Sequence, residues 1–310
     1  MTRPDKKHLL SICKIIFAVL AVGFLIWYFI KNRDDIAQIK SINIVIFVFS
    51  MLFYLLYKFT LATLWHYLTK INDCSIKYSK AVTAYLYSIL GKYIPGKVFM
   101  LAGRLTYYEE ENAPLSKVTV CFFIENLCTL LGAAMLFIVS LFFFPNELLM
   151  QYRWIVLILI AAFFVCIHPK VINLLLKIVG KLFKKELSIP MRYSQMLKAV
   201  LLFIANWLIV GVGFYILVLS IYPSVELSQM LFCAGIWGIS AIMGILAIFA
   251  PSGIGVREGI IIAGLSLIMP TEYAVVISVV SRLWQTIPEL LLAAGAFCYS
   301  QIGKIANRNK

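Results

Sequence analysis

The chain has 310 residues, of which 62% are hydrophobic and 14% charged, and its formal net charge is +14. Soluble domains are about 45–50% apolar and about 25% charged, so this composition excludes an ordinary soluble protein and predicts an all-α polytopic membrane protein. In such a protein the basic residues gather in the loops on one side of the membrane, so the charge does not point to nucleic acid as a partner.

Uninterrupted apolar runs predict about six full transmembrane helices, and no small-residue cleavage site follows the first. These runs are residues 9–30, 43–68, 118–144, 150–168, 199–222 and 274–299. Two further apolar regions, about 81–107 and 230–269, are interrupted by proline and glycine. Irregular backbone at membrane depth must line a cavity or be buried in protein. We therefore predict that each of these regions is a re-entrant helical hairpin, which enters and leaves on the same side.

The lysines and arginines predict the orientation of these elements. They are concentrated before the first run, after the second, in segment 169–198 and at the end of the chain, whereas segments 222–229 and 269–273 have none. The basic segments share one side only if both interrupted regions turn back. We therefore predict cytoplasmic N- and C-termini and an inverted repeat, with halves of about 42–168 and 199–300, in a single integral-membrane domain, 1–310.

The segment 169–198 joins the two predicted halves. Its apolar residues recur at helical spacing with lysines between them, which is typical of an amphipathic helix that lies in the membrane surface. Orientation and anchoring are the simplest role for this cytoplasmic linker, and recruitment of anionic lipid is the alternative.

The two breaks combine a proline, glycine and basic residues in the helix that follows. The residues are Pro95, Gly96, Lys97 and Arg104 in the first, and Pro251, Gly253, Gly255 and Arg257 in the second. A helix that begins after such a break directs free N–H groups and the positive end of its dipole into the membrane interior, where they can bind an anion. Paired breaks in two halves are typical of a transporter site at the midplane. The alternatives are a pair of packing kinks and, for Gly255 and Gly259, a helix-packing Gly-x-x-x-Gly contact.

Charged residues also occur inside the predicted membrane segments. Glu125 and Arg282 follow the two breaks at similar spacings, in equivalent helices of the two halves. A charge at the bilayer centre costs about 2.5–3.5 kcal/mol, so these two residues and Arg104, Arg257 and Glu258 must form pairs or face water. We predict that Glu125 and Glu258 neutralise some of the arginines and leave positive charge for a substrate anion. A closed ion-pair network without substrate is the alternative.

Other charged residues support weaker interpretations. Lys58 fits a side chain that snorkels or pairs within the bundle, and Glu289 follows Pro288 in the last run. Asp34 and Asp35, in the first outer loop, are what a membrane glycosyltransferase that uses polyprenyl phosphate would place there, although the outer loops are short for an acceptor site. The sequence has no catalytic constellation and no metal-ligand spacing, so we expect no enzyme activity, no cofactor and no metal.

The two interrupted segments resemble those of a known family. Residues 91–97 with 103–104, and residues 250–259, are similar to the signature segments of the lysylphosphatidylglycerol synthase transmembrane region, also called the flippase-like domain family. The resemblance covers about 10–300 and implies a helical bundle with two re-entrant elements around a lipid-accessible cavity. Asn126 follows Glu125 where members often have arginine, which weakens the transfer of an arginine role to this position.

Full-length synthases of this family carry an aminoacyl-transferase domain after the membrane part, and this chain ends at Lys310, so we expect no lipid lysylation. Stand-alone members resemble proteins found with cell-envelope polysaccharide assembly systems. The resemblance thus implies a multi-pass flippase of the inner (cytoplasmic) membrane, which translocates an anionic phospholipid or a polyprenyl- or glycolipid-linked intermediate. A non-transporting partner or regulator of an envelope glycosyltransferase is the alternative, and a membrane glycosyltransferase is less favoured. Nothing in the sequence indicates the oligomeric state.

Overall fold

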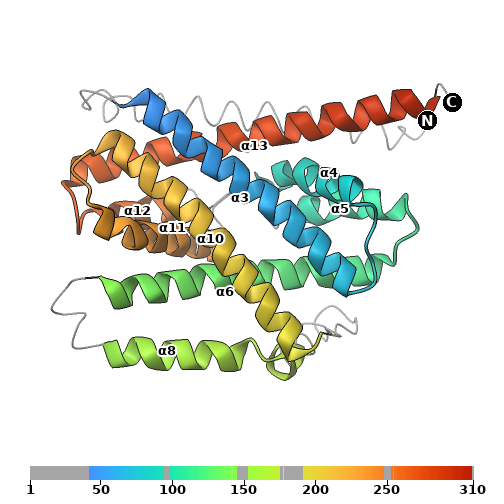
Figure 1. Cartoon of the computed structure of the whole chain (residues 1–310), viewed down its shortest axis with the longest axis horizontal. Helices are drawn as coiled ribbons and strands as arrows, with labels where there is room; N and C mark the ends of the chain where they lie inside the picture. The colour runs from blue at the N-terminus through green and yellow to red at the C-terminus, as the bar shows by residue number, and fades with distance from the viewer. Residues whose placement is uncertain are drawn as a thin grey trace, which may run out of the picture. The chain divides into compact units, whose positions relative to one another are not determined.

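A computed structural model of the chain describes residues 42–93, 98–144, 153–174, 177, 191–247, 253 and 255–308. The chain divides into two compact units, Met1–Ser41 and Ile42–Lys310. The first unit, with the predicted span 9–30, lies outside the described residues. In the second unit the described residues form helices and no strand (Figure 1). The predicted all-α class is therefore confirmed.

The helices follow one another along the chain without an intervening domain. They are α3 (Ile44–Ile71), α4 (Tyr78–Ser88), the 3₁₀ helix η1 (Ile89–Tyr93), α5 (Val98–Glu109), α6 (Leu115–Phe143), α8 (Arg153–Cys166), α10 (Tyr193–Ile221), the 3₁₀ helix η2 (Leu227–Gln229), α11 (Met230–Leu246), α12 (Val256–Leu265) and α13 (Thr271–Arg308). Five stretches of the described chain are long and apolar enough to cross a membrane: Ile44–Ile71, Leu115–Phe143, Tyr193–Ile221, Leu227–Leu246 and Thr271–Ser300. The protein is thus a multi-pass membrane protein.

Four of the six predicted full spans correspond to such helices, namely 43–68, 118–144, 199–222 and 274–299. The predicted span 150–168 contains α8, whose 14 residues cover about 21 Å, less than the ~30 Å of a hydrocarbon core. The stretch Leu227–Leu246, predicted as the first arm of a hairpin, is long enough to cross by itself. The number of spans, the re-entrant course and the orientation therefore stay predictions.

The helix α3 shows how the apolar surface is divided. The side chain of Asn43 accepts a hydrogen bond from the N–H of Ile46 at 3.1 Å and caps the helix. One face is buried, mainly against α10 and α4. Exposed apolar residues recur every three or four positions on the other face: Val45, Val48, Leu52, Leu56 and Phe59. In a membrane protein such a stripe faces lipid.

Both interrupted regions fold as pairs of helices. The helices α4 and α5 pack against each other on either side of residues 94–97, and α11 and α12 pack against each other on either side of residues 248–255 (Figure 1). Gly253 and Gly255 have positive φ angles of 70° and 83°, which glycine adopts without strain. The described helices thus end and begin on either side of the predicted breaks, while Pro95, Gly96, Lys97 and Pro251 themselves lie outside the described residues.

Candidate functional site

Two side chains, those of Glu258 and Arg282, bind the described backbone of the second break. Glu258, the third residue of α12, accepts a hydrogen bond from the N–H of Gly255 at 2.7 Å through Oε2. Its Oε1 forms an ion pair with Nε of Arg282 on α13. The Nη2 of Arg282 donates to the carbonyl oxygen of Gly253 at 3.2 Å. The chain's own carboxylate therefore takes one of the N–H groups that we expected at this helix start for a substrate anion.

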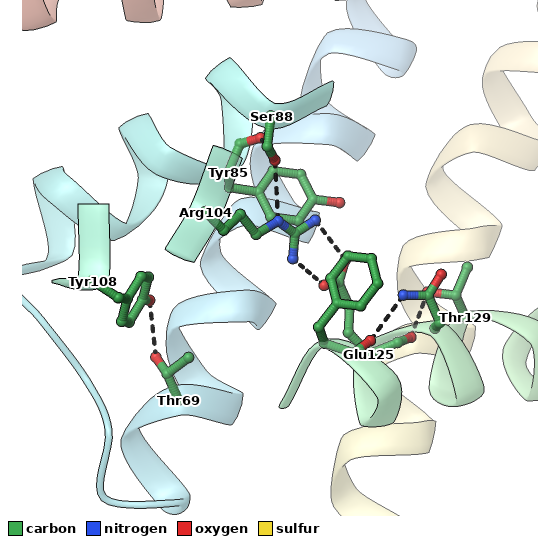
Figure 2. A network of polar contacts seen from close by, with 9 residues as sticks. Thr69, Tyr85, Ser88, Arg104, Tyr108, Glu125 and Thr129 are labelled. Carbon is green, nitrogen blue, oxygen red and sulfur yellow. Dashed lines mark hydrogen bonds and ion pairs between the residues drawn. The ribbon is translucent and has the colours of Figure 1, made fainter. Parts of the chain in front are cut away.

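Arg104, in the helix that follows the first break, also forms an ion pair with a carboxylate. It points from α5 to Glu125 of α6 (Figure 2), with Nη1 donating to Oε2, and Nη2 to Oε1 at 3.4 Å. Its Nε donates to Oγ of Ser88 on α4 at 3.1 Å. Its Cζ lies 4.4 Å from the ring centroid of Trp65 and 4.2 Å from that of Tyr85, within cation–π range. Arg104 is fully buried, so this pair ties α4, α5 and α6 together away from solvent.

As predicted, Glu125 and Glu258 form ion pairs with arginines. They pair with two of the three arginines considered. Glu125 neutralises Arg104, and Glu258 neutralises Arg282. In the first pair the arginine lies in α5, the short helix after the break, and in the second pair it lies in the long helix α13. The two pairs thus occupy similar places with their signs reversed.

Arg257 is the third arginine, and it differs from the other two. Within the described parts of the chain, no carboxylate lies at ion-pair distance from its guanidinium. Its Nη1 donates to Oε1 of Gln285 at 2.7 Å, and its Cζ lies 4.6 Å from the ring centroid of Trp237. The side chain is half-buried. Gly244 leaves room for it, because a Cβ there would lie 2.5 Å from Cγ of Arg257.

A further charged cluster joins three helices that are distant in sequence. Glu289 of α13 is fully buried, and its carboxylate lies 3.0 Å from Nζ of Lys58 on α3 and 2.6 Å from Nζ of Lys92 on η1. The hydroxyl of Tyr54 donates to Oε1 of Glu289 at 2.7 Å. Of the two roles considered for Lys58, pairing within the bundle is observed. This cluster was not predicted from the sequence, although two opposite charges in apolar runs, Lys58 and Glu289, were a signal that they pair.

Arg257 and this cluster lie along one face of α13. Gln285, which binds Arg257, and Glu289, which binds the two lysines, are four residues apart and so about 6 Å apart along the helix axis. Aromatic rings also connect the two: Trp284 lies 5.2 Å from Trp237, centroid to centroid, and 4.9 Å from Tyr54.

Gly255 and Gly259 do not pack closely against any of the described helices. A Cβ at Gly255 or Gly259 would meet no described atom within 4 Å, so the Gly-x-x-x-Gly spacing does not mark packing between described helices. Gly255 is explained by its positive φ angle. The described residues contain no group of three or more His, Cys, Asp or Glu side chains that could hold a metal ion.

Comparison with protein families gives a match over residues 15–293 to the family described as Lysylphosphatidylglycerol synthase TM region. The match spans both interrupted regions and all the buried charges above. A comparison with curated proteins found no match.

Proposed function

Because the chain belongs to the lysylphosphatidylglycerol synthase TM region family, a membrane domain of the flippase-like type, we propose that it translocates an anionic lipid or lipid-linked saccharide across the cytoplasmic membrane. The observation that supports this best is Arg257. It is a half-buried guanidinium in an apolar bundle, and it donates a hydrogen bond to the neutral amide of Gln285. A buried charge is costly unless it is paired, so a residue of this kind marks a place where an anion would be stabilised.

In the proposed mechanism the head group binds at Arg257 while the acyl or prenyl tail stays in lipid. The pairs Arg104–Glu125 and Glu258–Arg282 hold the two broken segments in place around the head group. Lys97 and the prolines of the breaks belong to the proposed site on the grounds of sequence alone. Alternating access then comes from one half of the inverted repeat rocking against the other.

Lipid scrambling by purified protein in liposomes tests this proposal. Fluorescent phosphatidylglycerol and a fluorescent polyprenyl phosphate are followed with the wild type, Arg257→Gln and the matched control Lys80→Gln, which removes the same charge from an exposed ion pair with Glu111. A charge-assisted hydrogen bond contributes about 1.5–3 kcal/mol, so we expect Arg257→Gln to scramble at least about tenfold more slowly and the control at the wild-type rate.

The outcomes separate the alternatives. Wild-type transport in Arg257→Gln would show that the site is assigned wrongly. Folded wild-type protein that moves neither lipid would contradict the transport function and favour a partner or regulator of an envelope glycosyltransferase.

A further inference from the structure

We propose that the head group carries two negative charges on phosphate, as a phosphate monoester or a diphosphate diester does, and that it binds to Arg257 and to Lys58 and Lys92 at the same time. This inference rests on the proposed function and narrows its substrate class. A phosphodiester head group such as that of phosphatidylglycerol, with one negative charge, would be the poorer ligand.

The charge of the described bundle interior is the first argument. Two of the ion pairs, Arg104–Glu125 and Glu258–Arg282, are neutral. The cluster of two lysines and Glu289 has a formal charge of +1, and Arg257 adds another, so the excess is +2. Excess charge at membrane depth is unfavourable, so a guest with two negative charges would balance the formal charge of these described residues.

The geometry of the cluster is the second argument. Arg257 and the two lysines are attached to α13 about one helical turn apart, through Gln285 and Glu289. A phosphodiester head group has two oxygens that share one negative charge. Such a head group would bind Arg257, and the two lysines would stay paired with Glu289 alone. A head group with more phosphate oxygens can reach both, because Arg binds phosphate through a planar fork and Lys as a point charge.

Exposure of the lysines supports access by such a ligand. The side chains of Lys58 and Lys92 are 12% and 18% exposed, whereas Glu289 between them is completely buried. A phosphate can therefore approach the ammonium groups from the accessible side while the carboxylate stays behind them. The same arrangement disfavours an aminoacylated head group, whose ammonium groups would lie beside Arg257 and the lysines.

The test measures equilibrium binding to detergent-solubilised full-length protein by calorimetry. The probes are dihexanoyl phosphatidic acid, a monoester, dihexanoyl phosphatidylglycerol, a phosphodiester with the same acyl chains, and a farnesyl diphosphate-linked sugar, a diphosphate diester. The monoester carries about −1.5 to −2 at neutral pH. We expect one or both dianionic probes to bind at least about tenfold more tightly than phosphatidylglycerol. Which of the two binds identifies the source of the dianionic phosphate.

Variants of the cluster distinguish a binding role from a structural one. Lys92→Gln is expected to reduce the preference for the dianionic probes to near parity, and Glu289→Gln to increase it. The double variant Lys92→Gln/Glu289→Gln returns the formal charge of the cluster to +1 and is expected to restore the wild-type preference. If Lys92→Gln alone does not fold, the other two variants still test the charge rule. Lys80→Gln is the control.

Failure of this inference differs from failure of the proposed function. If all probes bind equally and depend on Arg257, or if the preference is the same in every cluster variant, the dianionic head group is wrong and lipid translocation stands. If no probe binds and no lipid is scrambled, the proposed function itself is wrong.

Discussion

Replacing Glu125 by glutamine is expected to destabilise the protein strongly. Removing one partner of a buried ion pair costs about 3–5 kcal/mol, because the other charge stays buried without compensation. Arg104 is fully buried, and its remaining polar partner is the neutral hydroxyl of Ser88. The rings of Trp65 and Tyr85 stay in place in the variant, and glutamine keeps one oxygen acceptor. We therefore expect a loss near the lower end, about 3 kcal/mol.

The assay is the apparent melting temperature of the protein in detergent, followed by tryptophan fluorescence. For domains of about 150–250 residues, 1 kcal/mol shifts the melting temperature by about 2–4 °C, so the expected decrease is about 6–12 °C. The matched control is Glu111→Gln, which makes the same chemical change in the exposed ion pair with Lys80. An exposed pair contributes about 0–1 kcal/mol, so the control should shift by a few degrees at most.

Two results would refute this reasoning. If Glu125→Gln and Glu111→Gln shift the melting temperature equally, Arg104 does not depend on the carboxylate of Glu125. The second result concerns the double variant Arg104→Met/Glu125→Leu, which removes both charges and is expected to recover much of the loss. If the double variant is less stable than Glu125→Gln, the pair stabilises the protein by more than the neutralisation of one charge by the other, and the reasoning is wrong.

Three glycine substitutions test the packing of the breaks. Gly244→Ala places a Cβ 2.5 Å from Cγ in the flexible side chain of Arg257 and should displace that side chain. Lipid binding in the calorimetric assay should therefore weaken about tenfold, with little change in melting temperature. Gly259→Ala is the control, because a Cβ there meets no described atom within 4 Å. Gly253→Ala combines a φ angle of 70° with a Cβ 2.5 Å from backbone, and should lower the stability by about 2 kcal/mol or more, seen as a lower melting temperature. Gly91→Ala places a Cβ 2.6 Å from the backbone nitrogen of Met100 and should lower the stability by about 1–3 kcal/mol in the same assay. An unchanged melting temperature would contradict the tight packing of η1 against α5.

The long helices and the breaks could be predicted from local sequence. Runs of apolar residues predict α3, α6, α10 and α13, because a span of the membrane needs about 20 such residues in one segment. Proline and glycine locate the breaks, because proline lacks an N–H and glycine adopts positive φ, as Gly253 and Gly255 do. The described helix α8 covers only part of the predicted span 150–168, which therefore stays a prediction.

The partners of the buried charges could be predicted only in part. The cost of isolated charge requires that Glu125 and Glu258 find cations, but it does not say which arginine each one binds. The Glu289 cluster needs contacts between α3, η1 and α13, and Lys92 is 197 positions from Glu289 along the chain. Local patterns contain no information on such contacts, because they depend on how the helices pack.

The short helix α12 carries both a charge that is paired within the protein, Glu258, and the charge that we propose to bind the ligand, Arg257. Successive residues of a helix project about 100° apart, so Glu258 faces Arg282 while Arg257, its neighbour, faces Gln285 and Trp237. An anion that displaced Glu258 from Arg282 would also remove the bond to the N–H of Gly255 and open the break. An anion at Arg257 would replace only a neutral amide. The ionic partner Glu258 therefore holds the backbone of the break, whereas the neutral partner Gln285 would leave Arg257 available for the anion that we propose.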